Sequence, residues 1–267
     1  MPTAMEDFLF DLNGYLVIKG ALTKDQVARI NARADELMST PPDDDGWIGH
    51  VQRHGYTSVD GINLQNIVEG GEVFEELIDN PNWLEHARRY IGSQDGLFID
   101  EAFFNVRGAG EGLYMHSGGW KRRQRTQFRF HNSEFHCGQI NMLTALTDIG
   151  PGDGATTVVP GSHKSNLQHP QVHWPVIENT HKPAENIEGM IEVHLEAGDT
   201  LLFVDSLCHG AVARKGSGER RIFVYRYGPA WGNTRLGYQP SQELVARLTP
   251  ERHKILQPIT PRQPARA

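Results

Sequence analysis

Short apolar or alternating runs, separated by glycine and proline, dominate the chain from residue 97 onward. Alternation with period two places successive side chains on opposite faces of a strand, and short apolar runs between turn residues are typical of strands buried on both faces. The pattern predicts strands at 97–107, 138–146, 156–159, 187–195, 200–204 and 221–227. We therefore expect a mainly β protein, and this half of it to form a barrel or jelly roll.

The N-terminal part shows helical periodicity after one short strand, which we place at 14–18. Thr23 and Gln26 have the spacing of a capping box, which marks the start of a helix. An apolar stripe at helical spacing follows, made of Val27, Ile30, Ala34 and Leu37. This one-sided stripe predicts a helix that covers one face of a sheet.

Two further regions carry helical signals. One stretch lies within 72–90 and is interrupted at Pro81, because proline breaks the hydrogen-bond pattern of a helix. In the C-terminal part, short helices are predicted at 241–248 and from Thr249, and 258–267 is expected to be poorly ordered. These helices are expected to flank the β core.

The length of 267 residues is compatible with one large domain, because single β domains often reach this size. The 28 glycines and 15 prolines fit a turn-rich β protein better than a helical bundle. We expect one domain, with a buttress of strand and helices at 1–96, the β core at 97–230, and helices and a tail at 231–267.

Charge and cysteine content exclude several classes of protein. The formal net charge of −7 argues against a nucleic-acid-binding surface. Cys137 and Cys208 are the two cysteines, so the chain has no disulfide framework and no Cys-x-x-Cys zinc motif. No signal peptide and no membrane span is indicated. We expect a cytoplasmic protein with a small-molecule substrate and no membrane partner, while the oligomeric state is left open.

Two histidines stand at strand ends beside glycine. His116 precedes Ser117-Gly118-Gly119, and His209 precedes Gly210. Neutral imidazoles presented from separate strand edges are suited to an open mononuclear metal site. Arg220 follows His209 by eleven residues, and a guanidinium at this distance could hold a dicarboxylate through two parallel hydrogen bonds. Together these residues indicate a metal-dependent oxygenase.

Several segments resemble the phytanoyl-CoA dioxygenase family, and the resemblance extends over nearly the whole chain. They are the Asn13–Ile18 strand with its helix, 143–154, Val158-Val159-Pro160-Gly161-Ser162-His163-Lys164, His209-Gly210 and Arg220. The resemblance implies a double-stranded β-helix (jelly roll, cupin-like) with flanking helices. It also implies a dependence on Fe(II), 2-oxoglutarate and O2. By position, His116 and His209 match the iron ligands, and Arg220 matches the arginine that pairs with the distal carboxylate of 2-oxoglutarate.

One position departs from the family pattern. The family places a carboxylate two residues after the first histidine, and Gly118 stands there in this chain. Three alternatives follow. Asp205 is the candidate third iron ligand, with Asp100 and Glu101 as weaker ones; chloride could fill the position, as in related halogenases; or the site holds no metal, which would leave a binding protein on the same scaffold.

Other residues are candidates for contacts around this site. Asn141 and Thr144 could hydrogen-bond the cosubstrate, since both lie on a strand expected to face the barrel interior. Trp120, Arg122 and Arg123 are candidate substrate contacts. The basic segment that includes Lys121 and Arg125 could cover the pocket as a lid or meet an anionic substrate.

The remaining histidines and cysteines are expected to be structural. Pro-Gly-Ser-His closes a tight turn, so His163 is expected to hold neighbouring backbone. His131, Glu134 and His136 have no spacing that would bring them to one face as a second metal site. Cys208 is expected to be a small core residue. The sequence thus predicts an Fe(II)/2-oxoglutarate-dependent dioxygenase that hydroxylates a small metabolite.

Overall fold

The computed structural model describes residues 1–55, 61–92, 94, 96–121, 123–172, 185–232 and 239–257. Its helices are α1 (Ala4–Asn13), α2 (Lys24–Ser39), α3 (Glu72–Glu75), α4 (Leu84–Ile91), α5 (Gln242–Arg247) and α6 (Pro250–Leu256), with short 3-10 helices η1 (Ile67–Gly70), η2 (Gln124–Thr126) and η3 (Ser162–Lys164). Its strands are β1 (Tyr15–Ile18), β2 (Trp47–Ile48), β3 (Val51–Gly55), β4 (Ile62–Gln65), β5 (Leu97–Arg107), β6 (Leu113–His116), β7 (Phe130–His131), β8 (Glu134–Phe135), β9 (Ile140–Ala145), β10 (Thr156–Val158), β11 (Ile191–Val193), β12 (Thr200–Val204), β13 (His209–Ala211) and β14 (Arg220–Pro229).

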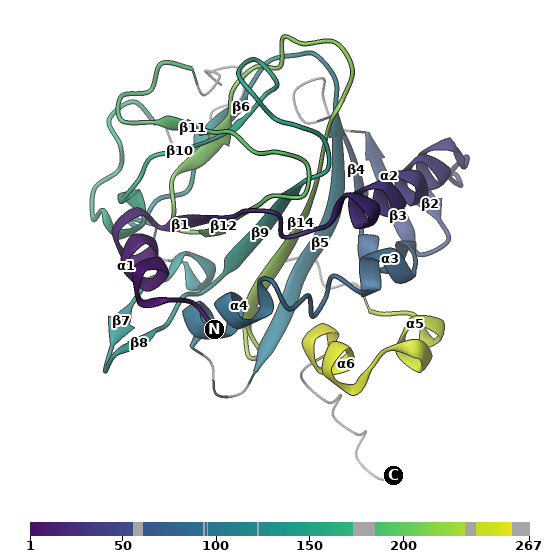
Figure 1. Ribbon diagram of the computed structural model, residues 1–267, viewed down its shortest axis with the longest axis horizontal. Helices are drawn as coiled ribbons and strands as arrows, with labels where there is room; N and C mark the ends of the chain where they lie inside the picture. Colours follow the sequence, from purple (N-terminus) through teal and green to yellow (C-terminus); the bar gives the residue numbers. More distant parts are fainter. Residues whose placement is uncertain are drawn as a thin grey trace.

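Two antiparallel sheets form the centre of the molecule (Figure 1). The large sheet has the order β1-β12-β9-β14-β5-β4-β3-β2, and the small sheet has the order β11-β10-β13-β6. Apart from the consecutive strands β2 to β5 and the pair β10–β11, neighbouring strands come from distant parts of the chain, as is typical of a jelly roll. The predicted double-stranded β-helix is confirmed.

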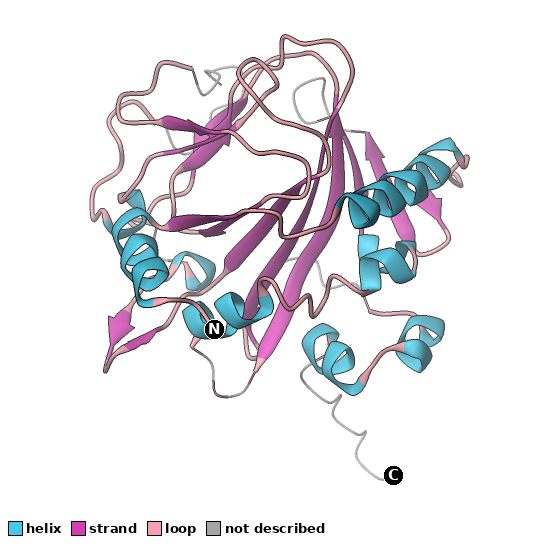
Figure 2. Cartoon of the chain, viewed as in Figure 1, coloured by secondary structure: helices cyan, strands magenta, loops and turns pink. Residues whose placement is uncertain are grey.

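The two faces of the large sheet have different partners. On β14, Tyr225 and Tyr227 donate hydrogen bonds to carbonyls of Phe74 and Ile78, so they face the helical layer. Because side chains alternate along a strand, Arg220 and Arg226 point to the opposite face, toward the small sheet. Figure 2 shows helices on the outer side of the large sheet, which leaves the inner face for the site.

The predicted helix starts are confirmed by their caps. The Thr23 hydroxyl accepts from the Gln26 amide, and the Gln26 side chain accepts in turn from the Thr23 amide. All four residues of the apolar stripe on α2 are buried. The interrupted stretch at 72–90 forms α3 and α4, on either side of Pro81.

Some boundaries differ from the prediction. The strand predicted at 187–195 covers only Ile191–Val193, and β14 extends to Pro229. Within 1–96, four strands rather than one join the large sheet, and α1 precedes them. A capping box between Thr3 and Glu6 marks the start of α1, the same signal that identified α2. The tail at 258–267 lies outside the described residues, and in the described part no helix has the length and apolarity needed to cross a bilayer.

Candidate metal and cosubstrate site

His116 and His209 face each other across two paired strands. The last residue of β6 and the first residue of β13 are register partners, so their side chains leave the small sheet side by side. Their ring centroids are 4.2 Å apart, with the planes inclined by 57°. Phe203 of β12 packs against the His209 ring at a centroid distance of 4.7 Å, which restricts the orientation of that imidazole.

Backbone hydrogen bonds define the tautomer of both rings. Nδ1 of His116 lies 3.1 Å from the Tyr114 carbonyl, and Nδ1 of His209 lies 2.7 Å from the Leu207 carbonyl. A carbonyl can only accept, so each Nδ1 carries the proton and donates it, and each Nε2 keeps its lone pair. This arrangement is the usual support of a metal-ligating histidine.

Burial keeps the imidazole of His116 neutral. Desolvation and the neighbouring His209 lower the pKa of His116 well below its ordinary value. A neutral imidazole is the form that binds a metal, because a protonated ring has no lone pair to donate. The electrostatics and the hydrogen bonds therefore agree.

Both histidines line a cavity of about 230 Å³ between the two sheets. Arg220 lines the same cavity, together with Thr156 of the small sheet and Asn105 of the large sheet. The volume is below the roughly 300–1,000 Å³ of sites for drug-sized ligands, so it suits a small molecule. The structure thus brings the three principal predicted residues to one space.

One end of the cavity concentrates positive charge. Arg220 is buried and donates to the Thr156 hydroxyl at 3.1 Å. Its register partner on β5 is Arg107, which is also buried and also lines the cavity. Burial and the nearby Arg107 and Arg214 lower the pKa of Arg220 to about 9. Like charges placed directly opposite destabilise a sheet, so this end of the cavity favours an anionic ligand.

The two candidates on β9 point in opposite directions. Asn141 shares the face of Leu143, which lines the cavity, and its buried carboxamide has no hydrogen-bond partner among the described residues. Thr144 lies three positions along, so the pleat turns it to the other face, where its hydroxyl bonds that of Thr200 at 2.6 Å. The prediction that Thr144 contacts the cosubstrate is therefore wrong in this structure.

Asp205 is not brought into a metal-binding group with the two histidines. Its buried carboxylate pairs with Arg125 at 3.4 Å and with Arg226 at 3.7 Å. In the described part of the chain, no three His, Cys, Asp or Glu side chains are placed to hold a metal ion. The weaker candidates are engaged elsewhere: Asp100 accepts from Gln139, and Glu101 pairs with Arg226.

Gly118 has no room for a carboxylate. A Cβ built at this position would lie 2.8 Å from Cδ1 and Nε1 of the Trp120 indole. The residue has φ +127°, a conformation that side chains other than glycine rarely adopt. The departure from the family pattern at 118 is thus matched by the local packing.

In the basic segment after Trp120, none of the described residues lines the cavity of the two histidines. Lys121 is buried, Arg123 is exposed, and Arg125 is anchored by its ion pair with Asp205. Arg122 lies outside the described residues. The predicted anion contacts from this segment are therefore not supported by the described residues.

The residues expected to be structural are placed accordingly. Nε2 of His163 donates to the Asp11 carbonyl at 3.1 Å, and its ring packs against Gly14. His131 and Glu134 pair across the β7–β8 hairpin, exposed to solvent. Cys208 is buried against Met115 and Val172, as predicted for a core residue.

Sequence reasoning missed Thr156 and Arg107. Thr156 begins β10, where a single hydroxyl carries no distinguishing pattern, and Arg107 ends a predicted strand where a solvent-facing arginine is the ordinary expectation. One signal was available in the sequence. Asn105 and Arg107 are two positions apart on the predicted strand, so these two polar side chains lie on the same face. Two polar residues on one face of a buried strand indicate a polar cavity.

Comparisons with known proteins agree with this geometry. The sequence profile of the family described as phytanoyl-CoA dioxygenase (PhyH) matches residues 10–222. Dioxygenase FUM3 of Gibberella moniliformis is 25% identical over 218 residues, which are 78% of this chain and 66% of that protein. Dioxygenase cdmD of Talaromyces verruculosus is 29% identical over 123 residues, 46% of this chain and 36% of that protein. The chain thus spans about a third to two-thirds of the length of these relatives.

Solved structures share the fold. HygX from Streptomyces hygroscopicus, with nickel and 2-oxoglutarate bound, superposes with a TM-score of 0.72 at 23% identity, over 91% of this chain and 94% of that chain. EctD from S. alaskensis superposes with a TM-score of 0.66 at 19% identity, over 96% and 88%. Because the family profile spans most of the sequence, the chain belongs to the phytanoyl-CoA dioxygenase (PhyH) family.

Proposed function

We propose that this protein is an Fe(II)- and 2-oxoglutarate-dependent oxygenase that hydroxylates, or otherwise oxidises, a C–H bond of a small molecule. One observation carries the proposal: the facing imidazoles of His116 and His209 share a cavity with the buried guanidinium of Arg220. Relatives named as dioxygenases support the reaction class.

The donor set fits iron(II). His116 and His209 would hold the metal through Nε2, since both Nδ1 atoms are committed to backbone carbonyls. Bound there, iron would supply the activation of O2, coupled to oxidative decarboxylation of 2-oxoglutarate. The chain itself supplies orientation of the ligands and a cavity between the two sheets.

Arg220 would bind the distal carboxylate of 2-oxoglutarate. The Thr156 hydroxyl, which Arg220 already contacts, lies at the same end of the cavity. A dianion there would offset the repulsion between Arg220 and the opposite Arg107, so binding would relieve a cost present in the free protein. Asn141 would contribute its carboxamide, which is buried and has no partner among the described residues.

A matched pair of arginines tests this assignment. Arg220→Gln should weaken 2-oxoglutarate binding about a hundredfold, because a buried charge-assisted pair is lost. Arg221→Gln is the control: Arg221 is the next residue but pairs with Asp35 and Glu219 on the other side of the sheet. Titration of the anaerobic Fe(II) protein, followed by the visible charge-transfer band, gives both affinities. Equal losses in the two variants would remove Arg220 from the cosubstrate site.

Whether Asp205 is the third iron ligand distinguishes a hydroxylase site from a site whose third position is open to chloride. If Asp205 moves to coordinate iron, Asp205→Asn abolishes Fe(II) binding. If it stays with Arg125 and Arg226, the variant binds Fe(II) nearly as before but loses roughly 1–3 kcal/mol of stability, because two half-buried arginines each lose one ion pair while Arg226 keeps Glu101. Calorimetry with Fe(II) and urea unfolding distinguish the two results.

Halogenation is the second candidate, and the specific observation behind it is the glycine at 118, where no side chain competes for a ligand position. Chloride dependence of the Fe(II) spectrum and a chlorinated product would establish it. Absence of heat for both Fe(II) and 2-oxoglutarate would instead indicate a metal-free binding protein on this scaffold.

A further inference from the structure

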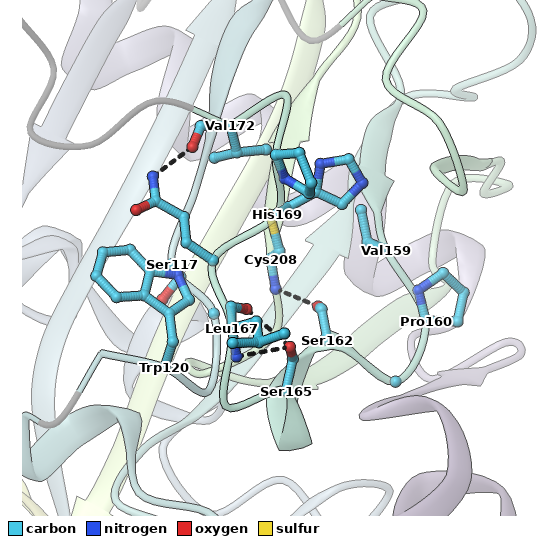
Figure 3. Close-up of a pocket in the computed structure, with 14 residues that line it drawn as sticks. Ser117, Trp120, Val159, Pro160, Ser162, Ser165, Leu167, His169, Val172 and Cys208 are labelled. Carbon is cyan, nitrogen blue, oxygen red and sulfur yellow. Dashed lines mark hydrogen bonds between the residues drawn. The ribbon is translucent and has the colours of Figure 1, made fainter.

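A second cavity, of about 360 Å³, lies between the segment after β6 and the segment from Val159 to Val172 (Figure 3). We call it the outer cavity. Its lining includes Ser117, Gly118 and Trp120 from the first segment, Val159, Pro160 and Leu167 from the second, and Cys208. It is larger than the cavity that holds the two histidines, and nothing in the proposed cosubstrate binding uses it.

The outer cavity begins one residue away from both candidate metal ligands. Ser117 and Cys208 line it, while their chain neighbours His116 and His209 line the inner cavity. Successive side chains of a strand point to opposite faces, so the backbone at 116–117 and at 208–209 separates the two cavities here. Gly118 also lines the outer cavity and adds no side chain there.

The described lining of the outer cavity carries no charged residue. Its polar groups are already bonded within the protein. The Ser162 hydroxyl accepts from the Cys208 amide, and the Gln168 side chain donates to the Val172 carbonyl. A bound molecule would therefore meet mainly carbon surface. Lys121 adjoins the cavity without being part of its described lining: its Nζ lies 5.7 Å from the centroid of the Trp120 ring.

His169 does not change this picture. Its Nε2 lies 3.0 Å from the Glu188 carbonyl, and its Nδ1 accepts from the Gln171 amide at 3.2 Å. Since one nitrogen must donate and the other must accept, the ring is the neutral tautomer with both sites used.

Trp120 forms one side of the outer cavity. Figure 3 shows the indole opposite Val159 and Pro160, with Cys208 between them. The edge of the indole lies against Gly118, at the place where a side chain of residue 118 would begin. Trp120 therefore contacts both the cavity and the glycine that stands two residues after the first candidate ligand.

We propose that the outer cavity binds the substrate to be oxidised, a neutral, largely apolar molecule with a ring that packs against Trp120 and reaches the metal past Gly118. The inference deepens the proposed function and rests on it. The size of the cavity falls within the range of sites for drug-sized ligands. The absence of charge in the described lining argues against the anionic substrate that the basic segment had indicated.

Calorimetry on the metal-free full-length protein tests the chemistry of the cavity with two probes of one shape. At neutral pH 2-naphthol is uncharged and 2-naphthoate is an anion. We expect 2-naphthol to bind at least tenfold more tightly, because the described lining offers no cation. Equal affinities, or tighter binding of 2-naphthoate, overturn the inference, and so does the absence of binding of both.

Variants locate the probe. Trp120→Ala should weaken 2-naphthol binding roughly tenfold, whereas Trp120→Phe should retain most of it. Trp231→Ala is the matched control, because Trp231 is 55% exposed and lines neither cavity.

Leu167→Arg is a second test. Leu167 is 79% exposed, so the substitution leaves the core intact. It should weaken binding of the neutral 2-naphthol and strengthen binding of 2-naphthoate. Unchanged binding in both Trp120→Ala and Leu167→Arg overturns the inference.

Mn(II), used in place of iron, tests whether the two cavities adjoin. Mn(II) bound to the wild type should broaden the NMR signals of bound 2-naphthol, and His209→Ala should remove the broadening without removing the probe. Sharp signals with both Mn(II) and probe bound overturn the inference. If Mn(II) does not bind the wild type, the proposed function fails, an outcome distinct from the loss of 2-naphthol binding.

Discussion

At the scale of single residues, the identity of each side chain and its immediate neighbours decide what the site can bind. His116 and His209 bond their own strands through Nδ1, which is a local device that needs only the carbonyl two residues earlier. Gly118 and Trp120 are a second local pair, because the Trp120 indole occupies the space into which a side chain at position 118 would extend. The orientation of each histidine therefore depends on residues within a few positions of it, whereas the pairing of β6 with β13 brings the two together.

Lys121 gives a pH prediction at this scale. Burial and the nearby Arg123 and Arg125 lower its pKa to about 8, from an ordinary value of 10.5. Between these two values the unfolded chain holds more protons than the folded protein, so stability should rise as the pH increases through this window. The gain should reach at most about 3 kcal/mol.

Urea unfolding at several pH values measures this gain. Lys121→Met keeps an apolar stem of similar length and should show no rise from this position between pH 8 and 10.5. A rise of equal size in Lys121→Met would assign the effect to other groups.

At the scale of elements, the pleat of each strand decides which predicted residues reach the site. Asn141 and Thr144 lie on one correctly predicted strand, yet only Asn141 faces the interior. The same parity sends Arg220 into the cavity and Tyr225 toward the helices. The side of β9 that faces inward depends on its register with β12 and β14, and no residue of β9 alone encodes that register.

The contact between Gly14, which follows α1, and His163 of η3 can be tested by substitution. A Cβ at Gly14 would lie 2.5 Å from Nδ1 of His163, and Gly14 has φ +82°. Gly14→Ala should therefore reduce stability by about 3 kcal/mol, through backbone strain together with the displaced imidazole.

Gly20→Ala separates these two contributions. Gly20 has φ +58° and no atom within 4 Å of its added Cβ, so this variant reports the backbone strain alone, about 1 kcal/mol. Denaturant unfolding of both variants gives the difference. Equal losses would show that the His163 contact adds nothing.

At the scale of the whole molecule, the two sheets together create a cavity that neither contains. The large sheet supplies Arg220, Arg107 and Phe203, and the small sheet supplies both histidines and Thr156. The register of β14 with β5 within the large sheet places Arg220 opposite Arg107, and both are buried. The free protein should therefore be less stable than the protein with an anion bound.

Ligand binding tests whether an anion near Arg220 and Arg107 stabilises the folded protein. At a hundredfold excess over its Kd, 2-oxoglutarate should stabilise the wild type by about 2.7 kcal/mol, even without metal. For a chain of this size the melting temperature should rise by roughly 5–10 °C in scanning calorimetry. Under the same conditions 2-oxobutyrate, which lacks the distal carboxylate, should have little effect. Equal shifts for both ligands would contradict a role for the positive end of the cavity.

Much of the element order was predictable because strand periodicity, helix caps and proline breaks act over a few residues. The β5 prediction matches the observed strand, and the Thr23 cap begins α2. Strands β2 to β4 were not predicted, because they are short, and the strand that joins them to the rest of the sheet, β5, pairs with β4 alone among these three and begins about thirty residues later. Their place in the sheet depends on packing that local patterns do not contain.

The sequence by itself determined the family and the order of the main strands and helices, and it predicted the site residues His116, His209 and Arg220, because motif spacing and periodicity are local properties. Only the tertiary structure decided that Asn141 rather than Thr144 faces the cavity, that Asp205 pairs with two arginines, and that Arg107 lies opposite Arg220. These outcomes depend on register and closure between segments up to a hundred residues or more apart, which are set by the packing of both sheets at once.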